Sequence, residues 1–478
     1  MAGTKVKHRS VEERIARGKG YRQKTPVSSS AGWAPAPDRP DPVALLEEQN
    51  LTREQDLVPV RYGRMLVSPF TFYRGAAKIM AADLKDTPRA GLITQLCGDA
   101  HMSNFGVFAS PERTLLFDLN DFDETLPGPF EYDVKRMSAS FTIAARNNAF
   151  SKEETRDVTL TAVRAYREAM AQFAKMRTLD IWYARLSEEQ LLETINLAVA
   201  SQKGKALKKA AQGMERTARA NVAKAHTRDS LQALSKLAEL VDGKYRIVSQ
   251  PPIVIPAREL GGSFSMSADE LEQVIREQLR SYRATLQEDR RHLLERFEII
   301  DVARKVVGVG SVGTRAFIAL LQGRDQQDPL FLQVKEATRS VLEDHLPKSK
   351  FKQPGERVVQ GQRVMQAASD IFLGWTRGAQ ENRYLYWRQL RDMKGSAVVE
   401  GMKPLGMTFY ANACGWTLAR AHARSGDAVA IAAYLGKSEK FDVAVADFSE
   451  RYADQNERDY QAFADAVRSG RLEAVEGL

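Results

Sequence analysis

The spacing of hydrophobic and polar residues divides the chain into a helical first half, a strand-rich middle and a helical end. Helical spacing covers 70–84 and most of 132–240, where no strand is predicted. Two short apolar segments at 91–97 and 113–119 predict strands, and the polar loop that follows the first covers 98–105. The first half therefore carries one conspicuous polar loop next to predicted strands.

The middle of the chain alternates between extended segments and helices. In order, we predict extended segments at 245–248 and 253–255, a long charged helix at 268–297, a strand, glycine turn and strand over 301–322, a strand at 330–334, a helix at 355–369, and strands at 371–375 and 384–390. From about residue 405 the spacing is helical to the end.

Composition adds that this is an ordinary folded protein. Of its 478 residues 43% are hydrophobic and 27% are charged, which is enough to bury a core. No run of about 18 apolar residues occurs, so we expect no membrane-spanning helix. The amino terminus is basic without the apolar segment of a secretory signal. Cys97 and Cys414 are too few for a disulfide framework, so we expect buried thiols in a cytoplasmic protein.

The net charge of +9 is concentrated in two places. Residues 1–25 and 201–240 each carry an excess of six positive charges, which leaves the rest of the chain slightly acidic. We therefore expect no specific nucleic-acid binding. We predict a solvated, partly disordered basic arm, followed by a Pro-rich strap that ends near residue 60. The basic helix 203–224 is either a solvated face or a contact for an acidic partner.

The densest chemistry lies in GDAHMSNFG (98–106) and FDLNDFDE (117–124). Loops at strand ends can aim several oxygens at one point, and oxygen ligands suit Mg²⁺. Asp99 and Asn104 are followed by a strand and then by Asp121 and Phe122. An Asp that accepts a hydroxyl proton, with an Asn and an Asp that hold Mg²⁺, is the division of roles in kinases.

These segments resemble the catalytic and metal-binding motifs of aminoglycoside phosphotransferases and choline kinases. The resemblance implies that Asp99 is the catalytic base and that Asn104 and Asp121 are metal ligands. In the following PFEYDVKRMSAS, it implies that Asp133 is a buried residue that opens a helix. The chain departs from that pattern at Cys97, where those families usually have His.

Several residues of this region have a second interpretation. Asp118 competes with Asp121 for the metal, and we prefer Asp121 because Phe122 follows it. Asp118 or Asp123 alone could be turn residues, and His101 alone could organise the loop through hydrogen bonds.

A glycine-rich segment, VVGVGSVGTRAF, follows much later, with Gly308, Gly310, Ser311 and Gly313 as candidate phosphate contacts. A dinucleotide-binding loop would need a long helix after the glycines. Here a short strand, a turn and the strand LFLQV follow, which favours a hairpin like the glycine-rich loop of kinases. That last strand runs into Lys335, in a segment that resembles the kinase V-A-I-K motif, so its ammonium is predicted to contact phosphates.

A kinase lysine needs a carboxylate from a neighbouring helix. We predict Glu356 for this role, with Glu343 as the alternative. The strands near Phe372 and Leu385, with RQLRDMKGS, are expected to supply the far side of the nucleotide pocket. Further candidate lining residues, for which packing is the simpler explanation, are Tyr73, Arg74, Trp375 and Arg377.

The two motif sets stand in the reverse of the usual kinase order, which a circular permutation would explain. We therefore predict an α+β, two-lobed, protein-kinase-like fold that is circularly permuted, with a helix-rich large lobe and a small antiparallel β-sheet lobe. Its predicted parts are the arm and strap (1–60), the first part of the large lobe with the catalytic loop (61–240), the small lobe (241–395) and the helices that complete the large lobe (396–478).

The chain as a whole also resembles a bacterial family known as domain of unknown function 2252. The resemblance rests on many segments in order, among them YGRMLVSPFTFYRGAA, LCGDAHMSNFG, LFDLNDFDETLPGPFEYDVKR, ERVVQGQR and LARAHARSGD. It implies one integrated unit and carries no activity.

The function we predict is transfer of the γ-phosphate of Mg-ATP to a hydroxyl of a small molecule or protein, with nucleotidyl transfer as a variant. A catalytically inactive nucleotide-binding module, a pseudokinase, is the first alternative. The second is a metal-dependent phosphohydrolase, because GDAH resembles the Asp-x-His opening of calcineurin-like phosphatases. The later GD and GNH[DE] segments of that family do not occur.

Overall fold

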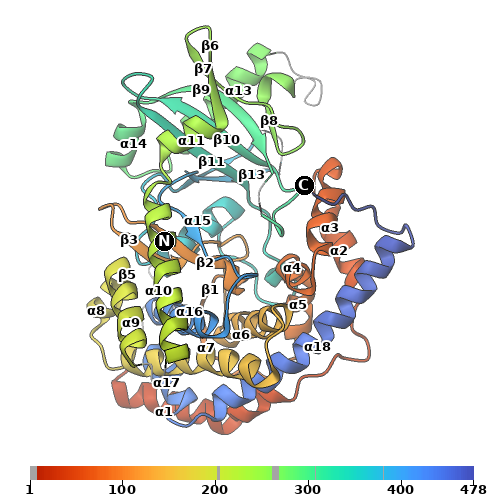
Figure 1. Cartoon of the computed structure of the whole chain (residues 1–478), viewed down its shortest axis with the longest axis vertical. Coiled ribbons are helices and arrows are strands. Elements are labelled where there is room, and N and C mark those ends of the chain that lie inside the picture. The colour runs from red at the N-terminus through yellow and green to blue at the C-terminus, as the bar shows by residue number, and fades with distance from the viewer. Residues whose placement is uncertain (1–7, 202–204, 261–267, 307, 380–381, 478) are drawn as a thin grey trace.

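The computed structural model describes residues 8–201, 205–260, 268–306, 308–379 and 382–477. It shows a mixed α+β fold in which several small antiparallel sheets lie against a large group of helices (Figure 1). Within these ranges no helix combines the length and the apolar character needed to cross a membrane.

The largest sheet has six antiparallel strands in the order β12-β13-β11-β10-β9-β8. Its strands are β8 (Val254–Pro256), β9 (Glu298–Lys305), β10 (Ala316–Gln322), β11 (Pro329–Glu336), β12 (Gly374–Arg377) and β13 (Tyr384–Gln389). Successive side chains of a strand point to opposite faces, so two sets of apolar residues leave β10 and β11. One set packs on α13 (Ala268–Arg283) and the other on α11 (Ser230–Leu237), which covers both faces.

Smaller sheets carry the acidic segments. The hairpin of β2 (Phe105–Ala109) and β3 (Leu115–Leu119) is flanked by β14 (Gly395–Ser396) and β5 (Leu186–Ser187). A separate pair joins β1 (Ile93–Leu96) to β4 (Leu126–Pro129), and another joins β6 (Ala238–Val241) to β7 (Lys244–Ile247).

The helical part is built from both ends of the chain. Before the first strand come α1 (Val11–Lys24), α2 (Pro42–Asn50), α3 (Val58–Leu66), α4 (Pro69–Gly75) and α5 (Ala77–Leu84). After β4 come α6 (Phe130–Asn147), α7 (Lys152–Phe173), α8 (Thr178–Tyr183), α9 (Glu188–Ser201) and α10 (Lys205–His226). Within the β-rich middle lie α14 (Glu288–Leu294) and α15 (Pro354–Met365), and the chain ends with α16 (Pro404–Ser425), α17 (Ala428–Leu435) and α18 (Lys440–Arg468).

Helices from the beginning and the end of the chain pack directly on one another. The α16 helix lies along α7, and α1 lies along α17 at the edge far from the six-stranded sheet (Figure 1). The core between them centres on α6, which is buried along almost its whole length. One core therefore includes residues from both termini.

The strands and helices of the middle segment are confirmed in kind, including the strand, glycine turn and strand before Lys335. Three predictions need correction. The 70–84 segment is two helices that break at Ala76, and the charged 268–297 segment divides into α13 and α14. The region 132–240 also holds two short strands, β5 and the start of β6. The strand β5 pairs with β3, which is distant in sequence, and β6 pairs with β7, which lies after this region.

The predicted disordered arm is wrong for residues 11–24, which form α1. Ser10 caps this helix and Glu13 completes a capping box, which satisfies backbone donors at its start. Gly18 is buried against α17, where a Cβ atom would lie 2.2 Å from the carbonyl oxygen of Ala430. Glycine thus lets two helices approach closely, a tertiary effect that the charge of the segment does not reveal. The basic helix forms as α10, although residues 203–204 of the predicted span lie outside the described residues.

Candidate functional site

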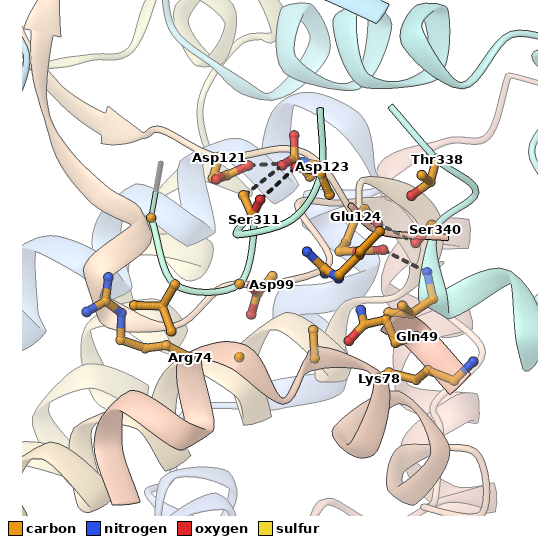
Figure 2. Close-up of a pocket in the computed structure, with 18 of the residues that line it drawn as sticks. Gln49, Arg74, Lys78, Asp99, Asp121, Asp123, Glu124, Ser311, Thr338 and Ser340 are labelled. Atoms are coloured by element: carbon orange, nitrogen blue, oxygen red, sulfur yellow. Dashed lines mark hydrogen bonds between the residues drawn. The ribbon is translucent and has the colours of Figure 1, made fainter. Parts of the chain in front are cut away.

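A cavity of about 410 Å³ lies where the acidic segments and the glycine-rich segment meet (Figure 2). The early segments contribute Asp99, Asn104 and Asp121 to its wall, and the late segment contributes Gly308, Gly310 and Ser311. Other walls come from the end of α2 with the residues after it, from the α4–α5 junction and from the segment after β11. Six of the predicted site residues are therefore brought together by tertiary structure.

The loop that carries Asp99 is held from beneath by Asp133, in the first turn of α6. The Asp133 carboxylate accepts hydrogen bonds from the backbone N–H groups of Cys97 (2.8 Å) and Gly98 (3.0 Å). Gly98 has a φ of +84°, and a Cβ atom there would lie 2.2 Å from the Glu124 carbonyl oxygen. The position therefore requires glycine.

Asp99 faces the cavity and is fixed by one arginine. Arg136 donates from Nε to Asp99 Oδ1 over 2.7 Å, and its guanidinium stacks 3.8 Å from the centre of the Tyr73 ring. One carboxylate oxygen of Asp99 is thus engaged, while Oδ2 has His101 Nε2 at 3.7 Å. Burial and the nearby arginine charges lower the pKa of His101 well below its usual value, so His101 is neutral.

Asp121 and Asp123 sit together at the opposite wall, beside Lys335. Lys335 Nζ lies 2.6 Å from Asp123 Oδ2 and 3.8 Å from Asp121 Oδ2. Tyr386 donates its hydroxyl to Asp123 Oδ1 over 2.6 Å, and Ser311 Oγ lies 3.4 Å from Asp123 Oδ2. Figure 2 shows Asp121, Asp123 and Ser311 turned toward one another. The glycine-rich loop therefore contacts the acidic segment directly.

The two carboxylates of this pair differ in their affinity for protons. Burial and the charge of Asp123 raise the pKa of Asp121. Burial opposes the charge of Asp123 as well, but Lys335 and the Tyr386 hydroxyl outweigh it and lower the pKa of Asp123. Of the two carboxylates, Asp121 is thus the one with the negative charge that is less well compensated by positive groups of the protein.

Asp118 lies elsewhere. It is fully buried, forms an ion pair with Arg420, and accepts a hydrogen bond from the Ala367 N–H over 2.8 Å. It is not among the residues that line the cavity. Every residue of β3 is buried, so Asp118 lies in the core, whereas Asp121 and Asp123, beyond the end of the strand, line the cavity.

Asn104 donates its side-chain N–H to the Asp99 carbonyl oxygen over 2.7 Å, which turns the amide oxygen the other way. In the described part of the chain, no three His, Cys, Asp or Glu side chains gather as a ready-made metal site. Asn104, Asp121 and Asp123 nevertheless supply oxygens around one cavity. Such a partial set fits Mg²⁺ that arrives with a phosphate and keeps some of its water.

The glycine-rich loop is fastened by residues near the amino terminus. Arg53 donates to the Val312 carbonyl oxygen, the Glu54 N–H donates to the Gly313 carbonyl oxygen over 2.8 Å, and Arg64 donates to Gly308 O over 2.6 Å. Gly313 has a φ of +85° and packs on Arg53 rather than lining the cavity. The loop therefore has its carbonyl groups tied to a segment outside the sheet.

Comparison with protein families assigns the chain. A model described as "Uncharacterized protein conserved in bacteria (DUF2252)" matches residues 53–466. The chain belongs to the DUF2252 family. Neither the curated proteins nor the solved structures give a match. The DUF2252 segment contains the acidic segments, the glycine-rich loop and Lys335, so the two motif sets belong to one family unit.

In this DUF2252 protein Lys335 does not pair with either of its predicted partners, Glu356 and Glu343. Among the described residues, the ion pairs of Lys335 are with Asp123 and Asp121. Glu343 instead caps its own turn by accepting from the Ser340 N–H, and Glu356 is half-buried at the start of α15. Lys335 is the residue before the last of β11, and from there its Nζ atom contacts Asp123 and Asp121 in the acidic segment.

Other expected lining residues also lie outside the cavity. The strands β12 and β13 and the segment 389–396 do not line it. Tyr73 is buried in the core, Trp375 packs partly buried against it and Arg377 is exposed, whereas Arg74 does line the cavity. The cysteines are both buried thiols, as predicted.

Several residues of the site were not chosen as site residues from the sequence, among them Arg53, Asp123, Glu124 and Arg136. Arg53, Glu124 and Asp123 line the cavity, and Arg136 fixes Asp99. Asp123 had a signal, since it stands two residues after Asp121 in a strand-end loop. Arg136 also had one, because it follows Asp133 by about one helical turn on α6. Arg53 had none, because only the fold brings it to the glycine-rich loop.

Proposed function

We propose that this DUF2252 protein is an ATP-dependent phosphotransferase that moves the γ-phosphate of Mg-ATP to a hydroxyl of a small molecule or protein. One observation carries the proposal. Asp99, Asn104 and Asp121 share a cavity with Gly308, Gly310 and Ser311, although the two groups are far apart in sequence. Kinases need this combination of base, metal ligands and phosphate loop in one place.

The arrangement of the large sheet also supports a kinase-like, circularly permuted fold. The glycine-rich loop connects β9 to β10, and the next strand, β11, carries Lys335 near its end. In protein kinases the loop likewise precedes the lysine, which lies on the third strand. The helices from both chain ends share one core, as a permuted large lobe requires.

The chain's residues divide the reaction between them. Asp99 Oδ2 accepts the proton of the acceptor hydroxyl, while Arg136 holds the other oxygen and fixes the carboxylate. The glycine-rich loop covers the phosphates, and Lys335 exchanges part of its contact with Asp123 for a phosphate oxygen. Mg²⁺, held by Asn104 and Asp121 with help from Asp123, would neutralise the developing charge on the phosphates. We prefer Asp121 to Asp118 because Asp118 is committed to Arg420.

The test is binding and turnover of Mg-ATP by the full chain. At about one hundred times its Kd, the ligand should raise the unfolding free energy by roughly 2.7 kcal/mol, seen as a shift in thermal unfolding. We expect Asp121→Asn to remove the Mg²⁺ dependence of this shift and Lys335→Met to weaken it. Asp99→Asn should keep the shift and lose phosphate transfer. Lys236→Met, at an exposed lysine of α11, is the matched control.

The outcomes separate the alternatives. No shift at millimolar Mg-ATP would contradict the proposal. A shift without any turnover, even in a broad acceptor screen, would favour the pseudokinase. Stabilisation by Mn²⁺ or Zn²⁺ without nucleotide would favour the phosphohydrolase.

A further inference from the structure

Most charged side chains on the cavity wall already have an oppositely charged partner. Lys78 lies 3.0 Å from Glu48 and 3.3 Å from Asp344, and Arg339 lies 2.8 Å from Asp344. The same holds for three further acids, each of which has a basic partner within 3.4 Å: Asp99 with Arg136, Asp123 with Lys335, and Glu336 with Arg315 and Arg383.

Arg53 and Arg74 are the exceptions among the lining cations. Neither has a carboxylate within ion-pair distance in the described ranges, and the Nε atom of each is buried without a hydrogen-bond partner. Within the described residues the guanidinium of Arg53 makes one hydrogen bond, to the Val312 carbonyl oxygen, and the guanidinium of Arg74 makes none. Burial lowers the pKa of both groups. Two partly buried guanidinium groups without counter-ions are costly unless a ligand pairs with them.

Their positions relate them to the candidate active site. Arg74 lies in the last turn of α4, below the glycine-rich loop, and a Cβ atom on Gly310 would lie 3.2 Å from the Arg74 carbonyl oxygen (Figure 2). Arg74 is influenced by the charge of Glu400 and then by that of Asp99. Arg53 is influenced by the charges of Glu124 and then Asp123. One arginine is thus on the side of the proposed base, and the other is on the side of the acidic pair.

We propose that Arg53 and Arg74 each bind an oxyanion group, a phosphate or a carboxylate, in this cavity. Arginine is suited to this task because its planar fork matches both groups. The inference rests on the proposed function for its biological meaning, since the anion is either the polyphosphate of the nucleotide or an acid group on the acceptor. Lys335 and the glycine-rich loop already serve the nucleotide, and Arg74 lies toward Asp99. The acceptor is therefore an anionic molecule rather than a cationic one of the aminoglycoside kind.

Calorimetric titrations of the full chain test this. The probes are inorganic phosphate, glycerol 3-phosphate and glycerol, each added with and without a saturating non-hydrolysable Mg-ATP analogue. We expect glycerol 3-phosphate to bind to the analogue-loaded protein and glycerol not to bind. Arg74→Met should weaken the binding of glycerol 3-phosphate by about ten- to a hundredfold, as for a lost charged hydrogen bond. Arg74→Lys should restore part of it, and Arg377→Met, at an exposed arginine, is the control.

The outcomes of these titrations show which molecule supplies the anion, and they test the oxyanion site and the phosphotransferase separately. If Arg53→Met or Arg74→Met weakens the analogue and leaves glycerol 3-phosphate within twofold, the site serves the nucleotide and the anionic acceptor is overturned. If both variants leave every probe within twofold of the wild type, the oxyanion site itself is overturned. Arg74-dependent phosphate binding in a protein that does not bind the analogue would support the oxyanion site and contradict the phosphotransferase.

Discussion

Asp118 and Asp121 are close in sequence, but they lie in different environments. Asp118 is enclosed in the core with Arg420, and both of its oxygens are engaged. Asp121 faces the cavity, is partly exposed and has Lys335 at 3.8 Å. A buried ion pair that loses one partner leaves an uncompensated charge, whereas a partly exposed acid can be removed at little cost to stability.

We therefore expect Asp118→Ala to lower the free energy of unfolding by about 3–5 kcal/mol, because Arg420 would be left buried and unpaired. Asp121→Ala should change it by about 1 kcal/mol or less, since it also relieves repulsion with Asp123. Urea denaturation of both variants measures the difference. If Asp118→Ala kept its stability and lost Mg-ATP binding, the assignment of the metal ligand would have to be reversed.

Glu124 gives the site a pH dependence. Burial raises its pKa to about 7, with the charge of Asp123 acting in the same direction. Its carboxylate accepts the Val341 N–H over 2.7 Å, so it links the acidic segment to the turn after β11. A folded-state pKa above the unfolded value means that the folded protein holds this proton more tightly.

The contribution of Glu124 to the free energy of unfolding should consequently decline as the pH rises from about 4.5 to about 7. Glu124→Gln keeps an oxygen for Val341 and removes the titration. Relative to the wild type, we expect this variant to gain about 1–3 kcal/mol between pH 5 and pH 8. Urea denaturation at a series of pH values tests this, and parallel profiles for the two proteins would show that Glu124 does not titrate in that range.

At the scale of elements, glycine decides which helices approach closely. Gly18 and Gly20 stand in the same turn of α1. A Cβ atom at Gly18 would collide with the backbone of α17, whereas one at Gly20 would meet nothing within 4 Å. Helix α1 therefore approaches α17 closely at Gly18 and not at Gly20.

This pair provides a matched test of the docking of α1. Gly18→Ala should lower the free energy of unfolding by about 1–3 kcal/mol because the two helices must move apart. Gly20→Ala should raise it by up to about 1 kcal/mol through helix propensity alone. Thermal unfolding compares the two variants. Equal, small effects would mean that α1 does not stay docked in solution.

At the scale of the whole molecule, the site is a product of long-range packing. The acidic segments lie on small sheets next to α6, and the glycine-rich loop lies on the six-stranded sheet. Lys335, Tyr386 and Ser311 reach from the second group to Asp123 in the first. Arg53, near the beginning of the DUF2252 segment, ties the loop to helices that precede both groups.

The sequence by itself determined the local elements and the candidate chemistry. The glycine hairpin before Lys335 and the loop with Asp99 and Asn104 were predicted from residue types and spacing, which act over a few residues. The buried Asp133 at the start of a helix was implied by the resemblance to aminoglycoside phosphotransferases and choline kinases. Only tertiary structure decided which side chains meet. It turned Asp118 into the core, gave Lys335 the partner Asp123 in place of Glu356 or Glu343, brought Arg53 to the glycine-rich loop and docked α1 through Gly18. The physical reason is that ion pairs and close helix contacts depend on distance in space, and neither charge nor spacing along a chain fixes that distance.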